Sequence, residues 1–346
     1  MPDLPPPSLR LRLDKDALAN NWRTLDSMSG TASAGAAVKA DAYGLGANEV
    51  VPVLRKAGVR DFFVAHWSEA PDVLRHVPPA QVAVLHGPVR PDDAAFANAA
   101  GITPVINSLG QAKRWADAGG GRCHLMVDTG INRLGVPLAE IHDPAIAALQ
   151  IDLLMSHLAS ADEESALNAR QLERFRSACA AVPARRRSLA NSAGIALGPD
   201  FAFDLTRPGL ALYGGVPRDE FAGSVRQVAF PQAAVIQVRE LAAGDTVGYN
   251  ATFTARKAMR AGIVSLGYAD GFLRCRGAGG VLRCGEARLP LLGKVSMDMI
   301  VVDLADAPEV QEGDWLEIPF DLAATAEISG LSQYELLTTL GRRFRP

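Results

Sequence analysis

The segment Ala36-Ala37-Val38-Lys39-Ala40-Asp41-Ala42-Tyr43-Gly44-Leu45-Gly46 begins with a short apolar run and continues into a polar turn that contains glycine. The same succession of apolar run, turn and helical stretch recurs as far as about Tyr213. Strands buried on both faces read as continuous apolar runs, and helical crossovers between them imply parallel pairing. Eight such runs occur: Ala36–Ala40, Phe62–Ala65, Val82–His86, Thr103–Ile106, His124–Val127, Ile151–His157, Arg187–Asn191 and Leu205–Tyr213. Eight parallel strands in succession predict a closed (β/α)8 barrel of the TIM type, an α/β fold.

A doubly wound parallel sheet is the alternative fold for this part of the chain. Such a sheet is expected to bind a phosphate at a glycine-rich first turn. The turn Ala42-Tyr43-Gly44-Leu45-Gly46 lacks the third glycine of the dinucleotide-binding fingerprint. We therefore prefer the barrel.

Beyond about Val225 the sequence changes in character. Short apolar runs separated by glycine, proline and acidic turns are typical of antiparallel strands. These runs are Ala233–Val238, Ala261–Leu266, Gly280–Leu282, Arg288–Leu292, Met299–Leu304 and Trp315–Ile318. The sequence therefore predicts a second, mostly β domain after the barrel.

The sequence also predicts secondary structure near both ends of the chain. The alternation in Leu9-Arg10-Leu11-Arg12-Leu13 is typical of a half-buried strand, and Ala323–Leu340 is more helical, with Ser332 suited to be an N-cap. We expect residues 1–13 to supply a strand that pairs with the second domain. The barrel is then expected at residues 14–225 and the β domain at 226–346.

The composition excludes several classes of protein. With 346 residues, 48% hydrophobic and 21% charged, the chain is too long for a small binding module and too apolar for disorder. A net charge of −3 without a basic block argues against nucleic acid as a partner. The four cysteines show no CxxC spacing, so no metal site is expected. Because the sequence contains no signal-peptide core and no membrane-length apolar run, we expect a cytoplasmic protein that does not contact the membrane.

Reactive groups of barrel enzymes lie where strands end, and Lys39 stands at the end of the first run. A lysine in apolar surroundings loses solvation of its charge, which lowers its pKa and makes the amine nucleophilic enough to react with a carbonyl. A lysine at a strand edge that extends to solvent is the alternative. Position alone does not decide between them.

Other strand ends carry further candidates. Arg133 follows the fifth run and His157 ends the sixth; alone, they are more often a surface arginine and a buried structural histidine. The segment Asn191-Ser192-Ala193-Gly194 has the hydroxyl and N–H groups that hold a phosphate where a helix begins. In the eighth run Arg207 precedes Gly209, which permits close approach of the backbone. Each signal is weak, but five strand ends together indicate one site.

The segment Ala37–Gly46 resembles the attachment motif for pyridoxal phosphate in bacterial alanine racemases. The likeness extends, in the order of that family, over nearly the whole chain. It includes Asp128–Gly135, Ser156–His157, Asn191–Ala193, Arg207–Gly214, Gly248–Thr252, Gly267–Gly271 and Ser296–Asp298. The resemblance implies a pyridoxal phosphate enzyme with a barrel and a C-terminal β domain, acting as a homodimer with shared active sites.

The resemblance also implies two bases on opposite faces of the substrate. Lys39 would bind the cofactor covalently and take the α-proton of D-alanine. Tyr249 of the partner subunit would take the α-proton of L-alanine, close to the backbone of Met297 and Asp298. Tyr268 would lie at the channel through which substrate enters. Such an enzyme supplies D-alanine, a precursor of peptidoglycan, or consumes it.

The resemblance also implies residues that assist the two bases and hold the cofactor and the substrate. A phenol has a pKa of about 10 and needs help to act as a base near neutral pH. His157 and Arg207 would form the chain that supports the tyrosine, with Arg207 also at the pyridine nitrogen. Arg133 would lie near the substrate carboxylate and the cofactor's phenolic oxygen. The phosphate would be held by Tyr43, Ser192, Gly209 and Leu210.

Two positions depart from the family pattern. Many members have a lysine, carbamylated in some, where this chain has Met126, so Arg133 must be positioned in another way, for example by a chloride ion. A late phosphate-binding tyrosine of the family aligns with Arg342. Two other functions stay open from the sequence: a pyridoxal phosphate decarboxylase of the same architecture, and a non-catalytic carrier of the cofactor.

Overall fold

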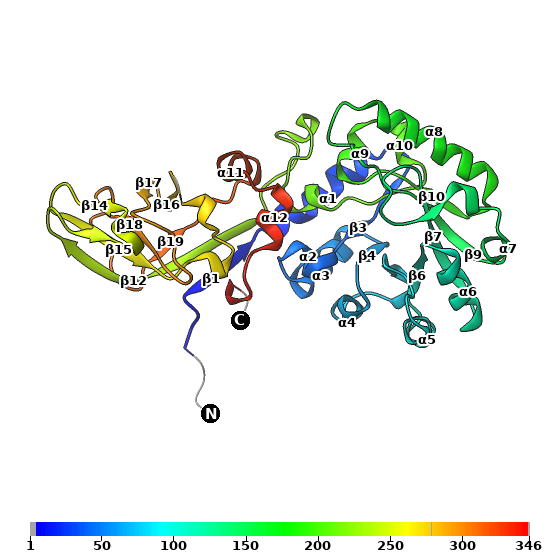
Figure 1. The fold of residues 1–346 in the computed structure, drawn as a ribbon, viewed down its shortest axis with the longest axis horizontal. Coiled ribbons are helices and arrows are strands. Elements are labelled where there is room, and N and C mark those ends of the chain that lie inside the picture. The colour runs from blue at the N-terminus through cyan, green and yellow to red at the C-terminus, as the bar shows by residue number, and fades with distance from the viewer. Residues whose placement is uncertain (1–4, 278, 345–346) are drawn as a thin grey trace. The chain divides into compact units, whose positions relative to one another are not determined.

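The computed structural model in Figure 1 describes residues 5–277 and 279–344. The chain divides into two compact units by its internal contacts. The first is Lys15–Arg226, and the second combines the residues up to Asp14 with those from Gln227 onward.

The first unit is built on parallel strands. Their bounds are β2 Ser33–Ala34, β3 Ala36–Ala37, β4 Phe62–Val64, β5 Val82–Val84, β6 Thr103–Ile106, β7 Arg122–Asp128, β8 Val136–Pro137, β9 Gln150–Met155, β10 Arg186–Ser188 and β11 Leu205–Thr206. The main sheet runs β3-β4-β5-β6-β7-β9-β10, with β8 paired to β7. β11 pairs in parallel with β2, which continues into β3, and an isolated bridge joins Asn191 to Arg207. These contacts close the sheet and confirm the predicted (β/α)8 barrel.

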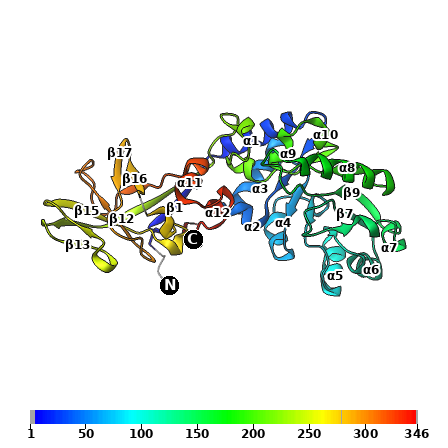
Figure 2. The ribbon, with the colours of Figure 1, turned by 45° about the horizontal axis from the view of Figure 1, so that its top comes forward.

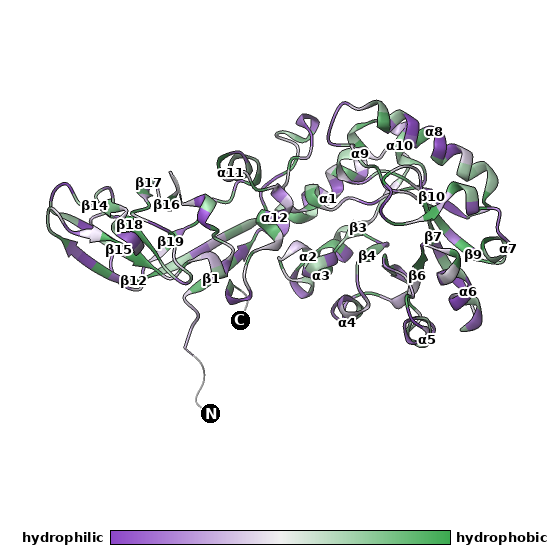
Figure 3. Cartoon of the chain, in the orientation of Figure 1, coloured by the Kyte–Doolittle hydropathy of each residue, from purple (hydrophilic) through white to green (hydrophobic). Residues whose placement is uncertain are grey.

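Helices lie around the outside of these strands (Figures 1 and 2). They are α1 Lys15–Met28, α3 Ala47–Ala57, α4 Ala70–Leu74, α5 Pro91–Ala100, α6 Leu109–Asp117, α7 Pro144–Ala147, α8 Ala166–Ala181, α9 Ser192–Ala196 and α10 Pro199–Ala202. Ser108, Ser165 and Asn191 cap α6, α8 and α9 through their side-chain oxygens. In Figure 3, hydrophilic residues gather on outer helices such as α6 and α8.

The barrel interior is filled by apolar side chains that the strands point inward. They are Phe63, Ala83, Val105, Met126, Leu153, Met155 and Leu205. A separate apolar layer, which includes Ile106, Leu125 and Phe175, packs between strands and helices. The two layers explain why the sequence of these strands is apolar without alternation.

Several predicted barrel strands end earlier than expected, most clearly the eighth and the first. The strand expected at Leu205–Tyr213 covers only Leu205–Thr206, and Leu210–Tyr213 forms a 3₁₀ turn. Pro208 has no N–H to donate to a neighbouring strand, so the ladder cannot continue through it. The strand expected at Ala36–Ala40 likewise ends at Ala37. In both places the chain leaves the barrel to form a loop at its C-terminal end.

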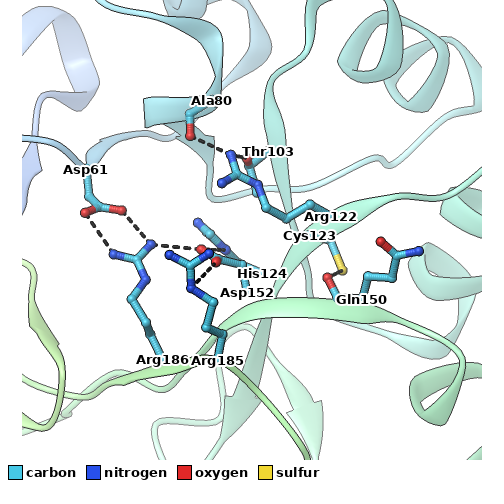
Figure 4. A network of polar contacts seen from close by, with 10 residues as sticks. All are labelled: Asp61, Ala80, Thr103, Arg122, Cys123, His124, Gln150, Asp152, Arg185 and Arg186. Carbon is cyan, nitrogen blue, oxygen red and sulfur yellow. Dashed lines mark hydrogen bonds and ion pairs between the residues drawn. The ribbon is translucent and has the colours of Figure 1, made fainter.

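The N-terminal end of the barrel contains a network of charged side chains (Figure 4). Arg186 on β10 donates two hydrogen bonds to Asp61, at 2.8 and 3.0 Å, and a third to Asp152 on β9 at 2.8 Å. Nδ1 of the buried His124 on β7 lies 3.9 Å from Asp152. Burial alone would lower the pKa of Arg186, but the two carboxylates outweigh it and raise the pKa. The network joins three strands and the residue that precedes β4.

The second unit is a mostly antiparallel sheet, as predicted. Its strands are β1 Leu9–Leu13, β12 Ala229–Leu241, β13 Thr246–Val247, β14 Phe253–Thr254, β15 Met259–Val264, β16 Val281–Cys284, β17 Ala287–Pro290, β18 Ile300–Asp303 and β19 Trp315–Glu317. The main order is β17-β16-β19-β12-β15-β18, and β1 pairs antiparallel with β12, placing Leu9 opposite Ala233. Two helices follow, α11 Leu322–Ser329 and α12 Gln333–Thr338; Ser332 caps the second. Among the helices of the described residues, none has the length and apolar character needed to cross a membrane.

Candidate active site at the barrel mouth

Lys39 begins a turn of unusual handedness at the end of β3. The turn is assigned as α2, Lys39–Tyr43, but its residues Ala40, Asp41, Ala42 and Tyr43 all have φ between +53° and +56°. For L-residues this left-handed conformation costs about 1–2 kcal/mol per residue, so the turn stores ~4–8 kcal/mol of strain. Such strain persists only where surrounding contacts hold it.

Several contacts hold the left-handed turn. The carboxylate of Asp41 accepts the N–H of Ala47 at 2.6 Å, where α3 begins. The carboxylate of Glu69 accepts the N–H of Ala40 at 2.8 Å. The Tyr43 ring packs against that of Tyr213, with centroids 4.8 Å apart. The turn therefore places Lys39 and Tyr43 at fixed positions on the same end of the barrel.

The surroundings of Lys39 favour its neutral amine. Burial lowers the pKa of Lys39, the positive charge of Arg133 lowers it further, and Glu69 acts in the opposite direction. A lysine with a lowered pKa is a better nucleophile and base near neutral pH. Of the two interpretations that the position of Lys39 leaves open, the structure favours the lysine that loses solvation.

Arg207 is buried at the same end of the barrel with neutral partners. Its guanidinium donates to the hydroxyl of Ser188 and to the carbonyl oxygen of Ser156. Among the ion pairs of residues 5–277 and 279–344, none joins Arg207 to a carboxylate. Burial lowers the pKa of Arg207 to about 10. This positive charge is thus available to a negative or electron-rich group of a ligand.

His157 lies among cations at the end of β9. Burial, followed by the charges of Arg207, Arg133 and Lys39, lowers the pKa of His157 to about 3. The imidazole is therefore neutral throughout the physiological range of pH. A neutral imidazole has one N–H and one bare nitrogen, so it can pass on a hydrogen bond without adding charge.

The residues predicted to hold a phosphate meet at the ends of β10 and β11. The hydroxyl of Ser192 accepts the N–H groups of Gly209 at 2.9 Å and Ala211 at 3.2 Å. A Cβ at position 209 would lie only 2.1 Å from the hydroxyl oxygen of Tyr43, so only glycine lets this phenol approach. Leu210 begins the 3₁₀ turn beside them. Hydroxyls and backbone N–H groups suit a phosphate, and the set fits pyridoxal phosphate.

Arg133 lies exposed in the loop after β7. Asp128 shapes that loop by accepting the N–H groups of Gly130 at 2.8 Å and Asn132 at 3.2 Å. Met126 is buried in the barrel interior and offers the arginine no charge. The loop, rather than a residue at position 126, thus sets where Arg133 stands.

Sequence reasoning missed Gln171, a fully buried residue of α8. Its amide nitrogen donates to the hydroxyl of Thr129 at 3.1 Å and to the carbonyl oxygen of His157 at 3.0 Å, and its oxygen accepts the N–H of Ala159 at 2.9 Å. It therefore ties together the loops that carry Arg133 and His157. A glutamine within a helix gives no such signal in the sequence.

The other predicted site residues lie in the second unit. Tyr249 has 66% of its surface exposed, and Met297 is also exposed. Tyr268 donates its N–H to the carbonyl oxygen of Ser296 at 3.1 Å, so its segment lies beside Met297. Asp298 pairs with Arg343 at 2.9 Å.

The Tyr249 loop is tied to the same part of the second unit. Lys294, three residues before Met297, donates to the side chain of Asn250 at 3.0 Å. Arg342 is exposed in a 3₁₀ turn, Arg342–Phe344.

Comparisons with known proteins agree with the resemblance. Family profiles of the alanine racemase N-terminal domain and C-terminal domain match residues 13–217 and 228–346. A biosynthetic alanine racemase of Agrobacterium fabrum is 41% identical over 97% of this chain and 92% of its own. An alanine racemase of Cereibacter sphaeroides is 44% identical, covering 97% and 96%.

A solved structure supports the same assignment. The alanine racemase of Bartonella henselae, described with covalently bound pyridoxal phosphate, aligns with a TM-score of 0.89 and 34% identity. The alignment covers 98% of this chain and 99% of that one. With profiles of both domains matched over most of its length, this chain belongs to the alanine racemase family.

Proposed function

We propose that the protein is an alanine racemase that uses pyridoxal phosphate to interconvert L-alanine and D-alanine. The observation that carries the proposal is Lys39, a partly buried lysine with a lowered pKa at the barrel mouth of a chain that matches the family in both domains. The bound cofactor supplies an electron-withdrawing ring that makes the α-proton of the amino acid removable.

Lys39 is the proposed attachment point of the cofactor and the base on the D face of the substrate. Its amino group takes or returns the proton at Cα. The lowered pKa keeps a larger share of the amine unprotonated near neutral pH, as a base requires. Arg133 is proposed to bind the substrate carboxylate, and its charge also lowers the pKa of the neighbouring amine.

Arg207 is proposed to donate to the pyridine nitrogen of the cofactor. Because a guanidinium gives up its proton reluctantly, a pyridine nitrogen held there would stay unprotonated, which would limit side reactions such as transamination. The absence of a carboxylate partner among the described residues leaves that charge uncompensated until a ligand binds. The phosphate is proposed to rest on Tyr43, Ser192, Gly209 and Leu210.

Tyr249 is proposed as the base on the L face, contributed by a second copy of the chain. Its exposure in the second unit, together with that of Met297 beside Asp298, supports a role at an interface between subunits. His157 is proposed to contact the phenol and to link it to Arg207. Tyr268 is proposed to line the channel that admits alanine.

The first test compares Lys39→Ala with Lys56→Ala, a change at an exposed lysine of α3. Replacement of Lys39 should abolish both the visible absorbance of the bound cofactor and the racemisation of L-alanine, followed by polarimetry. Replacement of Lys56 should leave both unchanged. Release of carbon dioxide instead of racemisation would favour a decarboxylase, and bound cofactor with neither reaction would favour a carrier.

A second test addresses Tyr249 and the shared site. Tyr249→Phe should retain the cofactor absorbance and slow exchange of the α-hydrogen of L-alanine with deuterated water more than that of D-alanine. Coexpression of Lys39→Ala with Tyr249→Phe should restore about a quarter of the wild-type activity, because half of randomly formed dimers contain one intact site. No recovery would contradict sharing between subunits.

We also propose that the enzyme works in the cytoplasm and supplies D-alanine for peptidoglycan. All four cysteines, Cys123, Cys179, Cys275 and Cys284, are free thiols, which suits a reducing compartment. The name of the Agrobacterium fabrum relative, a biosynthetic alanine racemase, supports the anabolic role. Relative turnover of a panel of L-amino acids by the purified protein would test the preference for alanine.

A further inference from the structure

Glu69 joins the ends of the first two barrel strands. One carboxylate oxygen accepts the N–H of Ala40 at 2.8 Å. The other accepts the N–H groups of Ala65, immediately after β4, at 2.7 Å and of His66 at 3.3 Å. Both oxygens are therefore committed to backbone donors, which fixes the orientation of the carboxylate.

The Ala40 N–H belongs to the peptide bond that directly follows Lys39. Ala40 is also the first residue of the strained left-handed turn. A hydrogen bond from a charged carboxylate to this N–H opposes relaxation of the turn toward the common right-handed region. Since the peptide bond is fixed, the direction in which the Lys39 side chain leaves the backbone is fixed as well.

Glu69 also provides negative charge in a site dominated by cations. Lys39 interacts electrostatically with Arg133 from the loop after β7, with His157 from the end of β9 and with His86 from the end of β5. Burial and Arg133 both act against an ammonium at Lys39, and Glu69 acts in its favour. The His66 ring contacts the His86 ring edge to face, with centroids 4.2 Å apart, next to this carboxylate.

We propose that Glu69 is the positioning residue of Lys39, holding the peptide bond that follows the lysine and presenting the negative charge that balances Arg133. Glu69 does not touch the reacting carbon in this scheme. It sets where the amine stands and how readily the amine carries a proton. This inference rests on the proposed function for its meaning in catalysis, but the link between Glu69 and Lys39 is measurable without turnover.

The test measures the reactivity of Lys39 in the full-length protein after removal of the cofactor. Trace labelling with acetic anhydride at several pH values, read by mass spectrometry, gives the rate at Lys39 relative to the exposed Lys56 in the same molecule. In Glu69→Gln the relative rate near pH 7 should rise about three- to tenfold, because loss of the negative charge favours the free amine. Glu69→Asp keeps the charge and should stay within about twofold of the wild type.

Glu49→Gln is the matched control. Glu49 is an exposed carboxylate of α3 that pairs with Lys15 at 2.7 Å. This variant should not alter labelling of Lys39. A relative rate in Glu69→Gln within twofold of the wild type, with unchanged circular dichroism and melting temperature, would overturn the proposal.

A second measurement covers the case in which Glu69→Gln does not fold. In wild-type protein labelled with ¹³C-glutamate, the carboxylate resonance of Glu69, assigned with Glu69→Asp, should shift at the same pH midpoint as the labelling of Lys39. A flat resonance through that midpoint would overturn the proposal. Failure of the proposed function is distinguishable, because it would appear as wild-type holoenzyme that does not racemise alanine.

Discussion

Each end of the barrel carries an arginine and a histidine, but the charge of the arginine is compensated in opposite ways at the two ends. At the N-terminal end, Arg186 is bonded to two carboxylates, Asp61 and Asp152. At the C-terminal end, Arg207 has only a hydroxyl and a carbonyl oxygen as partners among the described residues. The pKa of the first arginine is raised and that of the second is lowered to about 10 by burial.

The contrast distinguishes a structural charge from a functional one. A charge that holds the fold is neutralised within the protein, since an unpaired buried charge is destabilising. A charge that serves a ligand stays uncompensated, and the rest of the fold offsets its cost. Arg186 and Arg207 should therefore respond differently to replacement.

The largest expected effect is on stability at the N-terminal end. Arg186→Met leaves the carboxylates of Asp61 and Asp152 without their partner and should lower the free energy of unfolding by about 3–5 kcal/mol. Urea denaturation at neutral pH measures this loss. Racemisation per folded molecule should not change, and a loss below 1 kcal/mol would contradict a structural role for Arg186.

Acid should destabilise the protein through His124 and His157, whose pKa values are lowered in the folded state. Burial lowers the pKa of His124 to about 4, whereas the unfolded chain has an ordinary value near 6.5. The unfolded state therefore binds the proton first, and stability falls as the pH drops from about 6.5 to 4, by about 3 kcal/mol for this group.

The variant His124→Gln isolates the contribution of His124. Denaturation curves at pH 7 and pH 4.5 should differ less in this variant than in the wild type. The part due to His157, whose pKa is lowered to about 3, should remain. An unchanged difference would show that the N-terminal network does not sense acid through His124.

The opposite behaviour is expected at the C-terminal end. Arg207→Met should lower kcat for L-alanine about 100-fold, which corresponds to about 2.7 kcal/mol of barrier. The free energy of unfolding should change by less than about 1 kcal/mol, because relief of the buried charge offsets the lost hydrogen bonds. A loss of stability as large as that of Arg186→Met would remove the distinction between the two arginines.

The smallest effect is expected at Arg185, which precedes Arg186 and lies 3.6 Å from the same Asp152. Its side chain is 76% exposed, compared with 25% for Arg186. An exposed ion pair contributes at most about 1 kcal/mol, so Arg185→Met should shift the unfolding midpoint only slightly. A larger cost would mean that burial does not explain the importance of Arg186.

The sequence was sufficient for the barrel, because its buried strands read as apolar runs, although several strands end before those runs do. Lys39, His157 and Arg207 could be found by reading outward from apolar runs. Contacts between distant segments could not be found in this way. Glu69 and Gln171 bind backbone groups of other segments. Almost every residue type has these groups, so the sequence does not reveal which of them are bound.

Local conformation was predicted less well than topology. Ala40 and Ala42 are ordinary helix formers, so nothing in their identity indicates a left-handed turn; long-range contacts impose it. The expected strand through Leu205–Tyr213 was wrong after Thr206, although Pro208 signals where the ladder stops. A proline within an apolar run should have shortened that prediction.

The left-handed turn after Lys39 has a stereochemical consequence of its own. At φ of +53° and ψ of +46°, Ala40 occupies the region that a residue of inverted configuration prefers. Chemical synthesis of the chain with a D-residue at this exposed position should relieve about 1–2 kcal/mol of strain. At this position the backbone of the proposed racemase therefore favours the enantiomer that its own reaction would produce.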